Sequence, residues 1–249
     1  MKLISDISYG NLPEHKLDLY IPETDNYPTF VYLHGGGLVH GKKEDSKFYS
    51  SLCEMGIAVA TANYRMYPDA KYPEFIEDSA LCTKWVLENI AEYGGDTKKI
   101  FVGGSSAGGY LSMMLCFDKR YLENLNVKVS DVAGFVFDAG QPTTHFNVLT
   151  ERGMHRNRVI IDEAAPLYFI DGTEKYPPFL VIVSDNDMQN RLEQTNLFMS
   201  TLKHFGQDEK ASFLLMKDSK HCSYVNKQDE NGRFIFADMV NDFIKKSLS

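Results

Sequence analysis

The chain has 249 residues, 43% of them hydrophobic, and a formal net charge of −8. This length can bury a large core, and we expect a single domain spanning residues 1–249. The acidic balance argues against nucleic acid or an anionic membrane as the main partner. No apolar run approaches the length of a membrane span, and residues 1–6 show no signal-peptide pattern, so we expect a cytoplasmic protein.

The chain alternates between strand and helix patterns. Short apolar or alternating runs predict strands, and these are Lys2–Ser8, Lys16–Ile21, Thr29–Leu33, Ile57–Ala62, Ile100–Val102, Val132–Phe137, Phe179–Val183 and Ala211–Met216. Apolar residues at helical spacing predict helices, and these are Asp45–Met55, Phe75–Tyr93, Tyr110–Cys116, Arg191–Phe205 and Phe234–Lys246. The alternation predicts an α/β fold, with a mostly parallel sheet and helices on both faces.

Two parts of the chain depart from this alternation. The first two strands read as a hairpin, because Gly10–Pro13 supplies a turn between them. Residues 139–176 show no clear period, and a stretch this long without obvious structure is usually functional or poorly read. We interpret residues 139–176 as a small, partly helical lid insertion.

A sharp turn between a strand and a helix carries the clearest chemical signal. Gly104–Gly108 has the pattern G-x-S-x-G, with the apolar strand Ile100–Val102 before it and an apolar helix after it. This is the context of a nucleophile elbow, and it makes Ser106 the candidate nucleophile. The three fixed letters alone would occur by chance in about one chain in ten, given the usual abundance of Gly and Ser. Whether Ser106 is a nucleophile therefore depends on whether the rest of the chain supplies a base, an acid and an oxyanion hole.

Candidates for an acid and a base follow two later strands. A serine hydroxyl needs a base and an orienting carboxylate, and open α/β sheets place ligands at the carboxyl ends of their strands. Asp185 and Asp187 follow Phe179–Val183, and His221 follows the last strand. The order Ser106, Asp187, His221 is that of an α/β-hydrolase triad. Asp185 remains an alternative acid, although capping a turn is the commoner role of an Asp there.

A glycine run after the third strand supplies candidate donors for an oxyanion hole. His34–Gly37 has the sequence His-Gly-Gly-Gly. Glycines let the backbone approach a substrate closely, so we expect the amides of Gly36 and Gly37 to face the reacting carbonyl, together with the amide of Ala107. The His34 side chain is expected to brace this loop.

Other chemistry finds little support in the sequence. Gly36–Lys43 resembles a phosphate-binding loop, but Lys43 stands where that loop needs a hydroxyl for Mg²⁺. The sequence has no dinucleotide fingerprint and no zinc motif. The four cysteines form no C-x-x-C pair and read as reduced thiols. We expect no cofactor and no metal.

Taken together, these motifs resemble α/β-hydrolases of the carboxylesterase type, close to the hormone-sensitive-lipase-like and kynurenine-formamidase-like branches. The matching motifs are His34–Gly37, Asn63–Arg65, Gly94–Asp96, Gly104–Gly109, Pro166–Tyr168 and Ser184–Asp187. The resemblance covers the chain from about residue 30 onward. It implies an α/β-hydrolase fold and an acyl-transfer site.

The chain also departs from the hormone-sensitive-lipase-like pattern. Only 33 residues precede His34, and they read as strands, so we expect no large N-terminal cap. Ser105 replaces an Asp often found before the nucleophile, and Cys222 and Ser223 replace the usual Gly-Phe after the base. These changes bear on the substrate class.

The sequence therefore predicts a serine hydrolase that cleaves short-acyl carboxylic esters, acetylated carbohydrates included, through an acyl-enzyme on Ser106. A formamidase or small-amide hydrolase is the enzymatic alternative, and a hydrolase-fold binding protein is the non-enzymatic one. The expected partner is a small-molecule ester. The substrate-binding residues are unassigned, and homodimer formation is left open.

Overall fold

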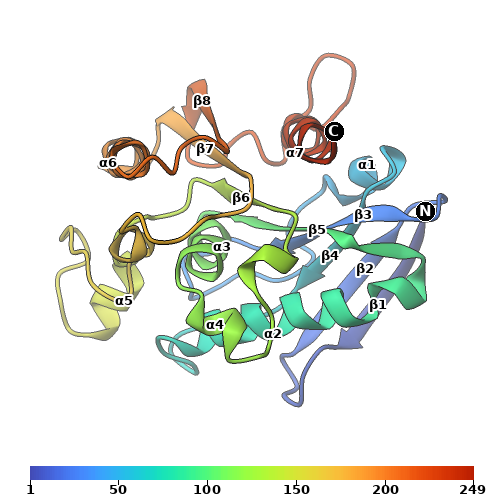
Figure 1. Cartoon of the computed structure of the whole chain (residues 1–249), viewed down its shortest axis with the longest axis horizontal. Helices are drawn as coiled ribbons and strands as arrows, with labels where there is room; N and C mark the ends of the chain where they lie inside the picture. Colours follow the sequence, from blue (N-terminus) through green and yellow to red (C-terminus); the bar gives the residue numbers. More distant parts are fainter.

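The computed structural model describes residues 1–249, and its centre is one sheet of eight strands in the order β1-β2-β4-β3-β5-β6-β7-β8 (Figure 1). The strands are β1 (Lys2–Ser8), β2 (Lys16–Ile21), β3 (Tyr27–Leu33), β4 (Ala58–Ala62), β5 (Gly95–Ser105), β6 (Gly134–Asp138), β7 (Phe179–Asn186) and β8 (Ala211–Lys220). Strand β2 is antiparallel to its neighbours β1 and β4, and every other pair is parallel.

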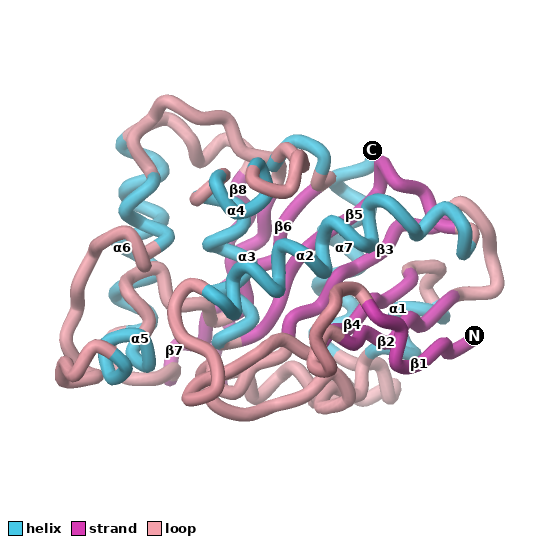
Figure 2. The backbone as a smooth tube through the Cα atoms, turned by 90° about the horizontal axis from the view of Figure 1, so that it is seen from below, coloured by secondary structure: helices cyan, strands magenta, loops and turns pink.

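Helices cover both faces of this sheet, as the alternation predicts. The α-helices are α1 (Tyr49–Glu54), α2 (Glu74–Asn89), α3 (Ala107–Phe117), α4 (Arg120–Glu123), α5 (Phe146–Glu151), α6 (Arg191–His204) and α7 (Ile235–Leu248). The 3₁₀-helices are η1 (Ile90–Tyr93), η2 (Val129–Asp131) and η3 (Pro166–Phe169). Helices α1 and α7 pack on one face, while α2 and α3 lie across the other (Figure 2). None of the helices combines the length and apolarity needed to cross a bilayer.

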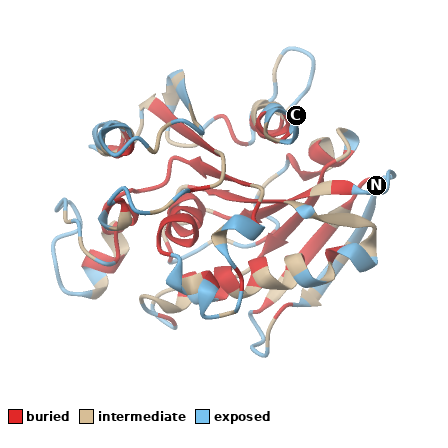
Figure 3. Ribbon diagram, viewed as in Figure 1, coloured by how far each residue is buried: buried red, intermediate tan, exposed pale blue.

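The central strands are buried because both of their faces are covered (Figure 3). Successive side chains of a strand point to opposite faces. In β3, Val31 and Leu33 therefore join the larger apolar cluster with α2 and α3, while Phe30 and Tyr32 join the smaller cluster with α1 and α7. This two-sided burial explains the continuous apolar runs in the sequence of the inner strands.

The structure corrects several of the predicted boundaries. For example, β5 extends on both sides of the predicted Ile100–Val102, and α2 ends at Asn89 and not at Tyr93. The first helix begins at Tyr49 and not at Asp45, because Asp45 accepts a hydrogen bond from the Lys42 amide in a preceding turn. Strand β8 continues through Lys220, beyond the predicted end at Met216. Its polar last residues do not have a strand-like pattern, but β8 pairs with β7 there, through Asn186 and Lys220.

Close approach of backbones fixes the position of α3 against the sheet. A Cβ atom on Gly108, in the first turn of α3, would overlap the carbonyl of Leu33 in β3. A Cβ on Gly104 in β5 would meet the same carbonyl. These two glycines therefore let the helix start directly above the ends of two strands.

We predict that Gly108→Ala lowers the free energy of unfolding by about 3 kcal/mol, because the helix must move off the strand. Chemical denaturation of both proteins measures this change. Gly153→Ala is the matched control, since Gly153 has a left-handed φ of 71° but no atom near its absent side chain. Its expected cost is about 1 kcal/mol, from the backbone alone. Equal costs at both positions would contradict the packing argument.

A buried carboxylate ends strand β6. Asp138 is fully buried, accepts a hydrogen bond from the Tyr224 hydroxyl at one oxygen and has no partner at the other. Burial disfavours the charged form and raises the pKa of Asp138 from 3.8 to about 6. An acid with a raised pKa in the folded state costs stability as the pH rises from about 4 to about 6.

We predict that Asp138→Asn removes this cost. The Asn carbonyl can still accept from Tyr224, but it carries no charge. The stability of the variant relative to the wild type should therefore rise by roughly 2–3 kcal/mol between pH 4 and pH 7. Denaturant unfolding at a series of pH values measures the difference. If the stability difference between the two proteins did not change with pH, Asp138 would not be a group whose pKa is raised by folding.

Candidate active site

The predicted nucleophile lies in a strained turn. Ser106 stands between β5 and α3 with φ of 57° and ψ of −112°. This left-handed conformation is uncommon for a residue with a side chain and persists only where its surroundings hold it. The Ser106 amide donates to the carbonyl of Asp138 at 2.7 Å, and the Ser106 carbonyl accepts from the Tyr110 amide at 3.0 Å. Both bonds hold the turn.

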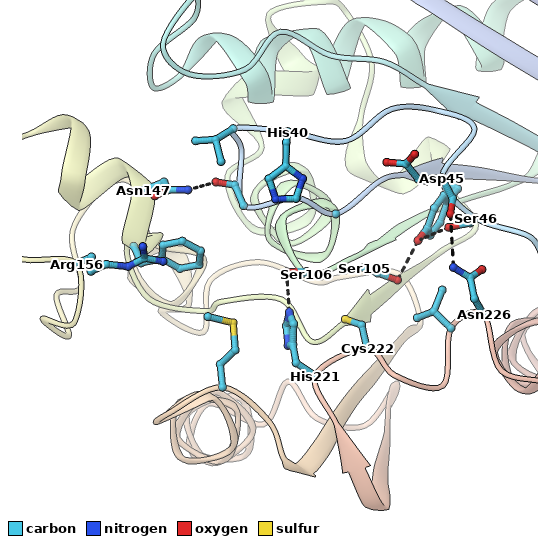
Figure 4. A pocket seen from close by; sticks show the side chains of 18 residues that line it. His40, Asp45, Ser46, Ser105, Ser106, Asn147, Arg156, His221, Cys222 and Asn226 are labelled. Atoms are coloured by element: carbon cyan, nitrogen blue, oxygen red, sulfur yellow. Dashed lines mark hydrogen bonds between the residues drawn. The ribbon is translucent and has the colours of Figure 1, made fainter.

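The structure brings Ser106 and His221 together (Figure 4), and it places Asp187 against the other side of the His221 ring. The Ser106 Oγ atom lies 2.8 Å from Nε2 of His221, and Nδ1 of His221 lies 2.6 Å from Oδ1 of Asp187. Asp187 follows β7 directly, and His221 follows β8. Because β7 and β8 are parallel neighbours, their carboxyl ends meet at the same edge of the sheet.

Asp187 is held as a carboxylate. Its side chain is fully buried, while that of His221 is 23% exposed. Burial alone would raise the pKa of Asp187, but the hydrogen bond and charge of His221 outweigh it, together with the Met188 amide and the charge of Arg191. The pKa of Asp187 is therefore lowered, and the carboxylate stays ionised through the neutral range.

The alternative acid has a different place. Asp185 accepts hydrogen bonds from the amides of Asp218 and Ser219, at 2.9 and 3.2 Å, and so ties β7 to β8. Two residues further along the chain, Asp187 is the acid that contacts His221.

The predicted glycine loop borders the same site. Gly36 and Gly37 have left-handed φ values of 113° and 65°, and their amides donate no hydrogen bond within the chain. Ala107 is the first residue of α3, where helix amides lack intrahelical partners. His34 is buried, stacks on Tyr64 at a ring separation of 4.3 Å and bonds the carbonyl of Gly35. It supports the loop from behind.

Gly36, Gly37, Ser106 and His221 line a cavity of about 600 Å³. Ser106 and His221 lie on its wall between two polar ends (Figure 4). Sequence reasoning singled out Ser105 and Cys222 of this wall. It missed the other polar and sulfur-bearing side chains, which are Tyr32, His40, Asp45, Ser46, Asn147, Arg156, Met188 and Asn226. The absence of a period in residues 139–176, which supply Asn147 and Arg156, was the only signal available for these two.

A hydrogen bond links the glycine loop to helix α5. Asn147 in α5 donates its side-chain amide to the carbonyl of Gly37. Two side chains thus hold the glycine loop: His34 contacts the Gly35 carbonyl, and Asn147 contacts the Gly37 carbonyl.

Solved esterase structures share this fold. Esterase B from Lactobacillus Rhamnosis superposes with a TM-score of 0.80 at 18% identity, covering 99% of this chain and 86% of that one. A truncated carbohydrate esterase from gut microbiota gives 0.77 at 20% identity, covering 99% and 96%. The predicted fold class is confirmed, and the fold is that of the α/β-hydrolases.

Curated relatives match parts of the chain. The esterase LipC of Mycobacterium tuberculosis is 27% identical over 79% of this chain and 54% of its own length. A probable isoprenylcysteine α-carbonyl methylesterase of Arabidopsis thaliana is 34% identical over 50% of this chain and 30% of its own length. The chain thus spans about half or less of the length of these relatives. The family model BD-FAE matches residues 17–202, well over half of the chain. The chain belongs to the BD-FAE family.

Proposed function

We propose that this protein is a serine esterase in which Ser106 is the nucleophile, His221 the base and Asp187 the orienting acid. The observation that carries the proposal is the continuous hydrogen-bonded chain from Ser106 Oγ through His221 to Asp187, with distances of 2.8 and 2.6 Å. This is the geometry that converts a serine hydroxyl into a nucleophile.

Each group has one task in the reaction. Ser106 Oγ attacks the ester carbonyl while His221 Nε2 takes the hydroxyl proton, and the amides of Gly36, Gly37 and Ala107 stabilise the oxyanion. His221 then gives the proton to the leaving alkoxide, which departs as the alcohol and leaves an acyl-serine. Water, deprotonated by His221, then attacks the acyl-serine. His221 returns the proton to Ser106 Oγ as the bond to the acyl group breaks, and the acid product leaves. Asp187 keeps the imidazole in the required tautomer throughout.

The proposed substrates are short-acyl carboxylic esters, acetylated carbohydrates included. Esters are supported by the esterases among the relatives and by membership in the BD-FAE family. A short acyl group is supported by the esterase 2 of Thermogutta terrifontis, solved with butyrate and with propionate, and a carbohydrate alcohol by the gut carbohydrate esterase. The polar side chains at the two ends of the cavity fit a hydroxylated substrate.

We predict that Ser106→Ala abolishes hydrolysis of p-nitrophenyl acetate and covalent labelling by a fluorophosphonate probe, because the attacking oxygen is lost. Activity should fall by at least about a thousandfold. Ser105→Ala is the matched control, since it removes the neighbouring hydroxyl and should retain labelling. Mass spectrometry of the labelled peptide identifies the modified serine. Labelling of Ser106→Ala at the wild-type rate would refute the assignment.

We predict that Asp187→Asn lowers kcat by about a thousandfold or more, because an amide no longer holds the His221 tautomer. Asp185→Asn should lower kcat by less than about tenfold. Asp185 accepts from the amides of Asp218 and Ser219 and from the Asn186 side chain, and an Asn oxygen can still accept from one of these donors. Steady-state kinetics on the same ester compares the two variants. A larger loss for Asp185→Asn would transfer the role of orienting acid to Asp185.

A further inference from the structure

A second, smaller cavity of about 90 Å³ adjoins the first. The two share Phe146, Arg156 and Met188 as a common wall. The remaining lining consists of two arginines and five carboxamide side chains, namely Arg158, Arg191, Gln141, Asn157, Gln189, Asn190 and Gln194. No carboxylate lines this cavity. Its wall therefore offers many hydrogen-bond donors and three positive charges.

The arginines of this wall differ from all others in the chain. Of the seven arginines, four pair with carboxylates, namely Arg65, Arg120, Arg152 and Arg233. The three without a carboxylate partner are Arg156, Arg158 and Arg191, and all three line the small cavity. Acidic residues outnumber basic ones by 34 to 26 in this chain. Three unpaired guanidinium groups at one place are therefore a local concentration of positive charge.

Two of these arginines are held in place. Arg191 is only 4% exposed, and its guanidinium donates to the carbonyl of Ala139 and to Gln141. The charge of Arg191 also acts on the Asp187 carboxylate, which offsets part of the positive field of Arg191 in the small cavity. Arg156 lies over the ring of Phe146, with 4.6 Å between its guanidinium carbon and the ring centroid. Stacking leaves the edge of the guanidinium free to bind.

The backbone adds to this positive potential. Helix α6 has 14 residues and begins at Arg191, with Asn190 as its N-cap. Both residues line the small cavity. The N-terminus of a helix carries a partial positive charge. The Arg191 amide donates to the Met188 carbonyl at 2.9 Å, so α6 acts on the cavity through this partial charge.

The two ends of the large cavity have opposite character. Arg156 and Asn147 lie on one side of Ser106, whereas Asp45 and Asn226 lie on the other (Figure 4). A substrate with one anionic end is favoured in one orientation, because its anion is attracted to Arg156 and repelled by Asp45.

We propose that the small cavity is an anion subsite and that the preferred substrates are esters carrying a carboxylate beyond the scissile bond. This inference rests on the proposed esterase function and narrows its substrate class. Planar guanidinium groups match the two oxygens of a carboxylate, so Arg156 and Arg158 would bind it at the mouth of the small cavity. Arg191 and the N-terminus of α6 add positive electrostatic potential in the same cavity.

The test compares matched esters that differ in charge. On the acyl side, the p-nitrophenyl monoester of glutaric acid is compared with p-nitrophenyl pentanoate. On the alcohol side, p-acetoxybenzoate is compared with p-acetoxybenzamide. We expect the wild type to have a higher kcat/KM for the anionic member of one pair. In the double variant Arg156→Gln/Arg158→Gln, the ratio of kcat/KM for that ester to kcat/KM for its neutral partner should fall by about tenfold or more.

Arg233→Gln is the matched control. It removes the same kind of charge from an exposed residue that pairs with Asp229, so it reports any effect of net charge alone. The preference for the anionic ester should survive in this variant. Equal kcat/KM for the charged and neutral members of both pairs in the wild type would overturn the subsite, while hydrolysis of the neutral esters would still support the esterase.

A binding measurement separates failure of the subsite from failure of the proposed function. Glutarate is titrated into the wild type and into the double variant by calorimetry. Binding to the wild type that is lost in the double variant supports the subsite even if no ester is hydrolysed. No difference in glutarate binding, together with no charge preference in catalysis, rejects it.

Discussion

The contact between the start of α3 and the end of β3 is the constraint on which the site depends. Because Gly104 and Gly108 have no side chains, the helix can begin one residue after Ser106, directly against the Leu33 carbonyl. The chain can make that turn only with Ser106 in a left-handed conformation, which presents its hydroxyl at the edge of the sheet. The position of Ser106 thus depends on backbone packing between α3 and the sheet, and its contact with His221 depends on that position.

Much of the fold could be predicted from sequence because the inner strands are buried on both faces. Their continuous apolar runs gave the strand segments, and glycines marked the ends of several helices. Prediction failed where structure depends on contacts distant in the chain. The polar end of β8 is a strand because β7 and the Asp185 carboxylate bind its backbone, and no local pattern encodes this. Helix α4 has only four residues, too few to show a period.

The candidate site divides in the same way. Ser106, Asp187 and His221 were found because each follows a strand, and the ends of parallel strands converge. The choice between Asp185 and Asp187 could only be weighed, since both follow the same strand and only geometry shows which one contacts the imidazole. Asn147 and Arg156 were missed because they belong to residues 139–176, a long connection without a period, whose path to the cavity no local pattern reveals.

The bond from Asn147 to Gly37 has a consequence for redesign. The proposed reactive groups lie at the ends of the strands, whereas the segment 139–176 carries Phe146, Asn147 and Arg156 of the cavity wall, so this part of the wall is a target for exchange. A graft of another wall segment would change the shape offered to the substrate without touching the strands. It would have to keep an amide donor at position 147, because that donor holds the loop whose amides we propose to bind the oxyanion. The segment is also bonded to the rest of the molecule elsewhere, for example from Arg191 to Ala139 and Gln141, so a graft would have to keep acceptors at those positions too.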